Sequence, residues 1–96
     1  MEQTIKIYEK ATLVNVEKSE RCVRPDWNWR EEFLDKTGKL EVCKNTSNVR
    51  RQYYFYFDCE EFEDYLTSGY GEMVVDGCEI TFTTRNSIYK FAVEFD

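Results

Sequence analysis

Five consecutive aromatic residues, Tyr53 to Phe57, constrain the fold of this chain more than any other stretch. Large flat side chains suit a pleated, half-buried surface, so the run predicts a β-strand. Successive residues of a strand point to opposite faces. The more apolar face carries Tyr53, Phe55 and Phe57, and we assign it to the core. The other face carries Tyr54 and Tyr56, whose hydroxyls can reach water or a partner while the rings stay covered.

An acidic segment follows the aromatic run and predicts one short helix near residues 59–68. Asp58 has the position of an N-cap, and Glu61 has the spacing that completes a capping box. Phe62, Tyr65 and Leu66 fall at i, i+3 and i+4, which is one stripe of a helix. The carboxylates of the segment should then face solvent near the helix N-terminus, where negative charge is favoured. They belong to Glu60, Glu61, Glu63 and Asp64.

The N-terminal stretch 4–17 alternates between apolar and polar residues and predicts a long first strand. Its expected inner face carries Ile5, Ile7, Ala11 and Leu13. Val14 and Val16 break this alternation, which predicts a bulge or a face that becomes buried.

Two interpretations compete for residues 26–34. As a helix, the stretch would be capped by Asp26 and would stack Trp29 on Phe33, one turn apart. As a strand, it would pair through a turn at 35–39 with a returning strand at 40–43, and Gly38 would take a positive φ in that turn. We favour the hairpin because it accounts for the whole segment.

The last part of the chain predicts three strands separated by turn sequences, at 72–75, 78–84 and 88–95. Asp76-Gly77 between the first two is the strongest hairpin signal in the sequence. In the second strand Ile80 and Phe82 share one face, and in the third Tyr89, Phe91, Val93 and Phe95 do. The predicted fold class is α+β: a mostly antiparallel sheet or partly open barrel of about six strands with one short helix. Residues 1–96 are expected to form a single compact domain.

Charge is divided unevenly along the chain. The net charge is -6, but residues 1–57 carry eleven basic and nine acidic residues, whereas residues 58–96 carry two basic and ten acidic residues. The acidic second half repels phosphate backbones, so direct nucleic-acid binding is not expected. The same half is attracted to basic surfaces, which nucleic-acid-binding proteins display.

The four cysteines, Cys22, Cys43, Cys59 and Cys78, are widely spaced, and the chain has no histidine. Zinc sites of the finger and ribbon type need close ligand pairs, so we expect no metal and no cofactor. No secretion signal or membrane-length apolar run is present, so we expect a cytoplasmic protein with free thiols, in the host cell if the source is viral. Cys43, Cys59 and Cys78 are expected to be small buried hydrophobes.

Motifs of catalysis are missing from the sequence. Without histidine there is no ordinary general base at neutral pH, and no glycine-rich phosphate loop occurs. Paired carboxylates occur at Glu31/Glu32 and in the acidic segment, where a solvated helix face accounts for them. We expect that the chain is not an enzyme.

The leading hypothesis is a small acidic inhibitor or adaptor that binds a protein with a basic, nucleic-acid-binding surface. In size, acidity and lack of catalytic motifs, the chain resembles the small phage-encoded inhibitors of host defence nucleases, including anti-CRISPR proteins and DNA mimics. Such a mechanism is occupation, with carboxylates where phosphates would lie and aromatic rings as anchors. The candidate protein-binding residues are Glu60, Glu61, Glu63, Asp64, Tyr54, Tyr56, Trp27 and Trp29.

The alternative is a small β domain that binds and sequesters a nucleotide or another charged ligand. Tryptophan next to arginine is a pattern that grips single-stranded nucleic acids and nucleotides. Its candidate ligand-binding residues are Arg24, Arg30, Arg50 and Arg51, beside Trp27 and Trp29. The arginines would have to converge with the tryptophans on one concavity.

Overall fold

The computed structural model describes residues 2–20, 22, 25–45, 53–59, 65–67 and 70–94. These residues form seven strands, all paired antiparallel, and one short 3₁₀ helix. The elements in chain order are β1 (Glu2–Lys18), η1 (Trp27–Phe33), β2 (Thr37–Asn45), β3 (Tyr53–Cys59), β4 (Tyr65–Thr67), β5 (Gly71–Asp76), β6 (Glu79–Thr84) and β7 (Ser87–Val93). No helix in these ranges is long and apolar enough to cross a membrane.

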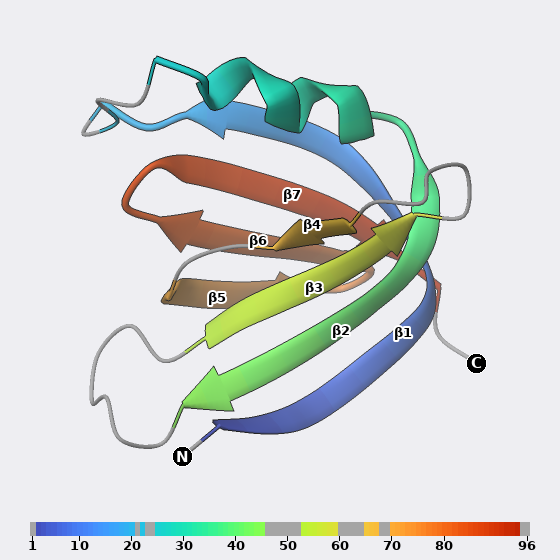
Figure 1. Cartoon of the computed structure of the whole chain (residues 1–96). Coiled ribbons are helices and arrows are strands. Elements are labelled where there is room, and N and C mark those ends of the chain that lie inside the picture. The colour runs from blue at the N-terminus through green and yellow to red at the C-terminus, as the bar shows by residue number, and fades with distance from the viewer. Residues whose placement is uncertain are drawn as a thin grey trace.

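The strands form one sheet that curls into an open ring (Figure 1). Their order is β2-β1-β7-β6-β5-β3-β4, and β2 also pairs with β3. Between β5 and β3 the ring is closed by a single residue pair, Tyr53 with Gly71, and the two strands then diverge. The antiparallel sheet is as predicted, but it has seven strands rather than about six and forms an open ring rather than a barrel, and the fold is mostly β rather than α+β.

The aromatic strand is confirmed as β3, and its inner face forms the centre of the core. Phe55 and Phe57 are fully buried. The ring centroid of Phe55 lies 4.8 Å from that of Phe82 and 5.0 Å from that of Phe91. These partners come from β6 and β7. Alternate aromatic side chains of β3 therefore pack across the interior against the opposite strands of the sheet.

The long first strand is also confirmed, but its inner face differs from the prediction. Ala11 and Leu13 are buried as expected, whereas Ile5 and Ile7 are exposed and Tyr8 is buried in their place. The pairing of β1 with β2 shifts register between Tyr8 and Ala11. Because side chains alternate with a period of two, such a shift exchanges the inner and outer faces of a strand.

A further irregularity of β1 falls between Leu13 and Asn15, where Val14 and Val16 predicted a bulge. Val14 is exposed, and Val16 is partly buried against the core. β1 pairs with β2 through its first part and with β7 through its second. Bulges bend a strand and increase its twist, so they allow β1 to curve and to pair with β2 in its first part and with β7 in its second.

The helix predicted near residues 59–68 is wrong where the structure can test it. Cys59 ends β3, and Tyr65–Thr67 is β4, in which Leu66 pairs with Phe57. Asp58 lies inside β3 and is not an N-cap. Leu66 is buried, as a helical stripe would also require, but it lies on the inner face of a strand. Residues 60–64, 68 and 69 lie outside the described residues.

Residues 27–33 form the helix η1 rather than the first strand of a hairpin, so the alternative interpretation is the right one. The rings of Trp29 and Phe33 meet edge to face, with centroids 6.2 Å apart. Phe33 also packs against Phe57, at 6.4 Å, which fixes η1 on the core. Asp26 precedes the helix, but its side chain makes no cap hydrogen bond. β2 needs no hairpin partner here because β1 and β3 flank it.

The turn before β2 has its positive φ, 65°, at Asp35 and not at Gly38. Asp tolerates the left-handed region better than most residues with a side chain. The prediction for Gly38 is therefore wrong.

The C-terminal meander is confirmed as β5, β6 and β7. Ile80 and Phe82 of β6 are buried, and so are the inner residues of β7, Tyr89, Phe91 and Val93. Phe95 lies outside the described residues. Asp76 pairs with Glu79, so the two-residue hairpin loop is Gly77-Cys78, one residue later than the predicted Asp76-Gly77.

We predict that Gly77→Val lowers the free energy of unfolding by about 1–3 kcal/mol. Gly77 has a φ of +62°, a conformation that a β-branched residue resists. A Cβ at this position meets no heavy atom within 4 Å, so the loss comes from backbone strain and not from a clash. Urea unfolding measures the change, with Gly77→Asn as the control, because Asn adopts positive φ more readily. Equal stability of Gly77→Val and the native chain would contradict the turn.

Candidate functional site

Four tyrosines lie in a row across the outer side of the sheet, and we call this row the tyrosine ladder. It runs from Tyr70 through Tyr54 and Tyr56 to Tyr65, with successive ring centroids 5.2, 5.7 and 6.0 Å apart. The first two contacts are edge to face and the third is tilted. Such spacings are those at which aromatic pairs attract one another. The ladder is therefore a connected aromatic surface.

Strand pairing assembles the ladder from three separate parts of the chain. Tyr54 and Tyr56 belong to the outer face of β3, as the sequence predicted. Tyr65 joins them because it pairs with Asp58 at the end of β3. Tyr70 directly precedes Gly71, the residue at which β5 touches β3.

The rings of the ladder differ in exposure. Tyr56, Tyr65 and Tyr70 are exposed by 40, 54 and 39%. Tyr54 is only 7% exposed, because it has a neighbouring ring on either side. Tyr54 therefore supports the ladder, and the other three present the surface that a partner can touch.

A shallow hollow lies beside Tyr56 and Tyr65, with a volume of about 240 Å³. Its lining also includes Lys39, Glu41 and Asp58. Lys39 and Asp58 are opposite one another across β2 and β3, and the Oγ1 of Thr4 donates to Glu41 Oε1 at 2.7 Å. Ligand cavities usually measure about 300–1,000 Å³, so this hollow suits a single inserted side chain better than a free metabolite.

The acidic candidates Glu60, Glu61, Glu63 and Asp64 lie outside the described residues. In sequence they stand between Cys59, the last residue of β3, and Tyr65, the first residue of β4 and the end of the ladder. Their prediction as binding residues remains a prediction.

The two tryptophans belong to η1, and no ring contact in the described structure joins either of them to the ladder. Trp27 is buried, and its Nε1 donates to Ser87 Oγ at 2.7 Å. Trp29 is exposed by 39% and holds the guanidinium of Arg30 over its ring at 4.7 Å. Trp27 thus ties the helix to β7, and Trp29 keeps an open face.

Arg30 is the only arginine of the ligand-binding alternative that lies in the described ranges, and it is buried. Its Nε donates to Tyr89 Oη at 3.0 Å, and one terminal nitrogen donates to the carbonyl of Trp27 at 3.2 Å. The guanidinium is thus used inside the protein and does not line a concavity with the tryptophans. Arg24, Arg50 and Arg51 lie outside the described residues.

Sequence reasoning missed two members of the ladder. The sequence pattern predicts Tyr65 in a helical core stripe, and it gives no local signal for Tyr70. The alternation of Tyr65, Leu66 and Thr67 was the available signal for the first, but a three-residue strand is too short for its period to stand out.

The described residues contain no group of three Cys, Asp or Glu side chains that is arranged to hold a metal ion. The four cysteines are free thiols. Cys43 and Cys59 are buried as predicted, but Cys78 is exposed because it lies in the hairpin loop.

Comparisons with known proteins give no family for the chain: no family model matches it, and neither a curated protein nor a solved structure is significantly similar to it.

We predict that Arg30→Ala lowers the free energy of unfolding by about 1–3 kcal/mol. The substitution leaves the buried Tyr89 hydroxyl and Trp27 carbonyl without the donors that they have now. Urea unfolding measures the change, and Arg85→Ala is the control, because Arg85 is exposed. If both variants unfolded alike, Arg30 would not be part of the structural framework, and a ligand-binding role for it would gain support.

We further predict that all four thiols react with a thiol reagent when the chain is unfolded without reductant. In the native protein Cys78 should react first, and Cys43 and Cys59 last, because reaction requires exposure of the sulfur. Timed alkylation followed by mass spectrometry of peptides measures this order. Two or fewer reactive thiols in the unfolded chain would show that disulfides form.

Proposed function

We propose that this chain is a small protein-binding inhibitor or adaptor that occupies the basic surface of a nucleic-acid-handling protein, in the manner of phage-type inhibitors and DNA mimics. The observation that carries the proposal is the tyrosine ladder, whose last ring, Tyr65, directly follows in sequence the segment 60–64, in which four of the five residues are acidic. Anchoring rings and negative charge thus adjoin one another along the chain.

The ladder supports the proposal because exposed tyrosines on a rigid sheet suit a protein interface. A tyrosine buries a large apolar ring while its hydroxyl keeps a hydrogen-bond partner, and few rotatable bonds are immobilised on binding. Tyr and Trp are enriched among the residues that dominate binding energy. Tyr56 and Tyr65 also flank the hollow with Lys39 and Asp58, so a partner side chain can meet both apolar and charged groups there.

Charge supports the choice of partner. Residues 58–96 carry ten acidic and two basic residues, so a basic surface would be attracted to this half of the chain. Electrostatic attraction of this kind raises association rates and favours partners of opposite charge. Carboxylates in the position of phosphates would block the partner's nucleic acid, which makes the proposed action binding and not catalysis.

We predict that the double variant Tyr56→Ala/Tyr65→Ala stays folded and loses most of its partner binding, by about 2 kcal/mol or more. The rings are exposed, so the free energy of unfolding should fall by only about 1 kcal/mol for each. The immobilised native chain and the variant are compared by quantitative mass spectrometry of proteins captured from a host lysate. The control for loss of an exposed apolar side chain is Val14→Ala, on the outer side of β1. Tyr8→Ala would not serve, because Tyr8 is buried.

The charge of the acidic segment is tested by Glu60→Lys/Glu63→Lys/Asp64→Lys. Capture of basic, nucleic-acid-binding proteins should fall strongly, and capture by the native chain should itself weaken as salt rises. The matched control is Glu9→Lys/Glu31→Lys/Glu32→Lys, which changes the net charge equally at exposed sites in the first half. A folded acidic-segment variant that captured the same proteins as the native chain would overturn the proposal.

A further inference from the structure

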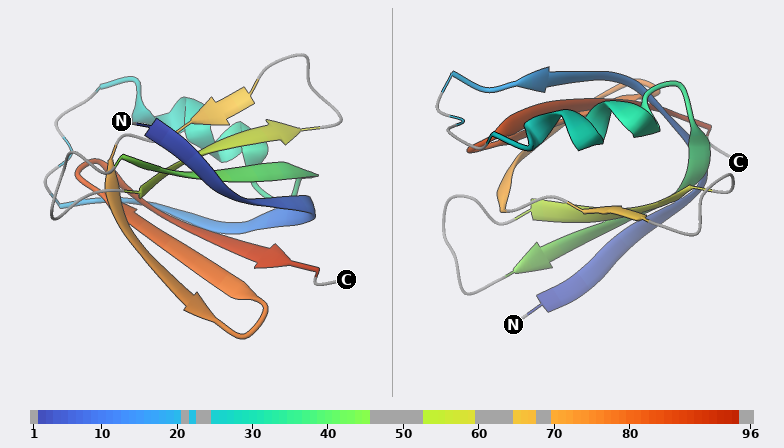
Figure 2. Two further views of the ribbon diagram at one scale, coloured as in Figure 1. Left: turned by 90° about the horizontal axis from the view of Figure 1, so that it is seen from below. Right: turned by 45° about the horizontal axis from the view of Figure 1, so that its top comes forward.

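Within the described part of the chain, strand β5 is hydrogen-bonded along one edge only, apart from its first residue. It pairs with β6 from Gly71 through Asp76. On its other side the only pair among the described residues joins Gly71 to Tyr53 of β3. The β5–β6 hairpin projects from the ring with β5 on its outer side (Figure 2, left). With respect to the strands that the structure describes, residues 72–76 therefore present an open edge, which we call the β5 edge.

The geometry of the hairpin decides which backbone groups point outward from this edge. The two-residue loop places Asp76 and Glu79 at the ends of a β-turn, where the Asp76 carbonyl accepts from the Glu79 N–H. In antiparallel pairs, residues bonded across the ladder alternate with residues that are not. Val74 therefore bonds to β6, and Met73 and Val75 turn their N–H and carbonyl groups to the open side.

The side chains of β5 also leave room for another strand. On its outer face Val74 is exposed by 63%. On its inner face Met73 packs against the core, but Val75 is exposed by 49% although it pairs with the buried Ile80. Val75 is exposed because β3 has already diverged from β5 (Figure 1). A strand added to the edge would cover Val75 with every second side chain.

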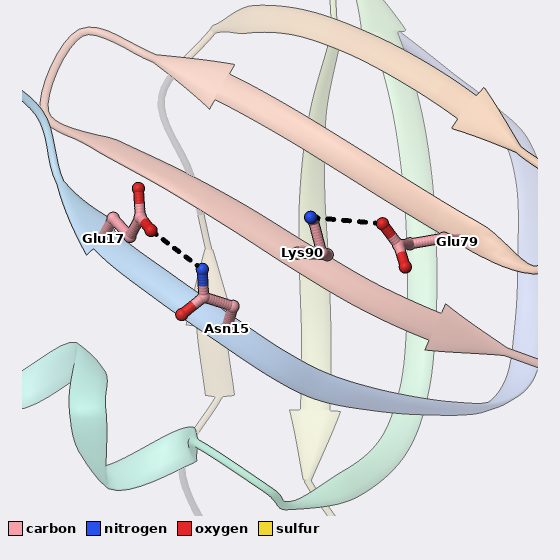
Figure 3. Close-up of polar contacts among 4 residues, drawn as sticks. All are labelled: Asn15, Glu17, Glu79 and Lys90. Atoms are coloured by element: carbon pink, nitrogen blue, oxygen red, sulfur yellow. Dashed lines mark hydrogen bonds and ion pairs between the residues drawn. The ribbon is translucent and has the colours of Figure 1, made fainter.

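The charges beside the edge favour a basic occupant. Glu79 forms an ion pair with Lys90, with Oε1 and Nζ 3.2 Å apart (Figure 3). Glu72 and Asp76 have no ion-pair partner within the described part of the chain, and both are exposed. Asp76 also lies directly opposite Glu79, and like charges in that position destabilise a pair of strands. A cation next to Asp76 would relieve this repulsion.

The same charges disfavour a second copy of the chain as the occupant. If two copies of β5 paired antiparallel about Val74, each Glu72 would lie opposite an Asp76, because both are two residues from the centre. This arrangement adds two pairs of like charges to an edge that is already acidic. Charged residues on an edge strand are a known means by which proteins prevent self-pairing.

We propose that the β5 edge binds an extended segment of a partner protein as an added strand, with basic side chains opposite Glu72 and Asp76 and apolar side chains toward Val75. Main-chain hydrogen bonds from Met73 and Val75 supply the attachment, and the alternating side chains supply the selectivity. This inference goes beyond the proposed function, because it concerns a different surface and a defined pattern of partner sequence.

The test uses an acetylated, amidated heptapeptide with Lys at positions two and six, Val at three and five, and Thr elsewhere. Its two cations have the four-residue spacing of Glu72 and Asp76. Hydrogen exchange of the full chain, followed by NMR, should show slower exchange at the amides of Met73 and Val75 on addition of peptide. The Val74 amide, already bonded to β6, should change little. This alternation distinguishes strand addition from general electrostatic binding.

Two variants separate backbone pairing from charge. Val75→Pro removes an outward N–H and none of the bonds to β6, and edge strands tolerate proline, so the fold should persist while peptide affinity falls about tenfold or more. Glu72→Lys/Asp76→Lys should weaken binding about tenfold or more and reverse the preference toward a peptide with Glu in place of Lys. The matched control Glu31→Lys/Glu32→Lys, on η1, should bind the basic peptide as the native chain does.

The following outcomes test strand addition at the β5 edge and do not test the tyrosine ladder. Absence of protection at Met73 and Val75 with saturating peptide, or equal binding of the acidic peptide, would overturn the proposal. So would protection that grows with protein concentration in the absence of peptide, because it would identify a second copy as the occupant. Tyr56→Ala/Tyr65→Ala should bind the peptide normally, so failure of the proposed function and failure of this inference are separable.

Discussion

The inward packing of Phe55 and Phe57 is the interaction on which the ring of strands depends. Among the described residues, strand pairing closes the ring between β5 and β3 at one residue pair only, so packing across the interior has to hold this side of the ring together. The rings of Phe55 and Phe57 lie within 5.2 Å of Phe91 on β7, across the interior. Burial of a large ring contributes about 1.5–3 kcal/mol, roughly twice the net value of about 0.5–1.5 kcal/mol for a hydrogen bond with water as its competitor. Because side chains close the core, the outer face of β3 needs no covering layer, and its tyrosines remain available.

The helix η1 shows how residues with the character of a binding site become structural. Tryptophan and arginine in close sequence are typical of surfaces that stack on bases. Here Trp27 and Arg30 reach Ser87 and Tyr89 on β7 instead. Buried donors must find acceptors, and the guanidinium finds them in a hydroxyl and a carbonyl while it stacks on Trp29. The sequence contains the same residues in either case; only the position of the helix decides between the two roles.

What could be predicted from the sequence follows from the length over which a period repeats. β3, β6 and β7 alternate for six or seven residues, and their inner faces were predicted correctly. β4 has three residues, so a helical stripe through Tyr65 and Leu66 explained the same pattern equally well. The inner face of β1 was predicted wrongly before Ala11, because the register shift between Tyr8 and Ala11 cannot be recognised from the sequence pattern. The tyrosine ladder required the register of β4 on β3 and the approach of β5, which are long-range contacts that local periodicity does not contain.

One residue connects the two candidate surfaces. Gly71 pairs with Tyr53 of β3 and Thr84 of β6, and a Cβ there would meet the carbonyl of Thr83. Only a residue without a side chain permits three strands to approach so closely. On one side of Gly71 the chain bears Tyr70, the first ring of the ladder, and on the other it begins the β5 edge. The divergence of β3 from β5, which leaves the second edge of β5 unpaired among the described residues, therefore starts beside Tyr70. The two candidate surfaces therefore adjoin one another at Gly71, although each is built from different strands.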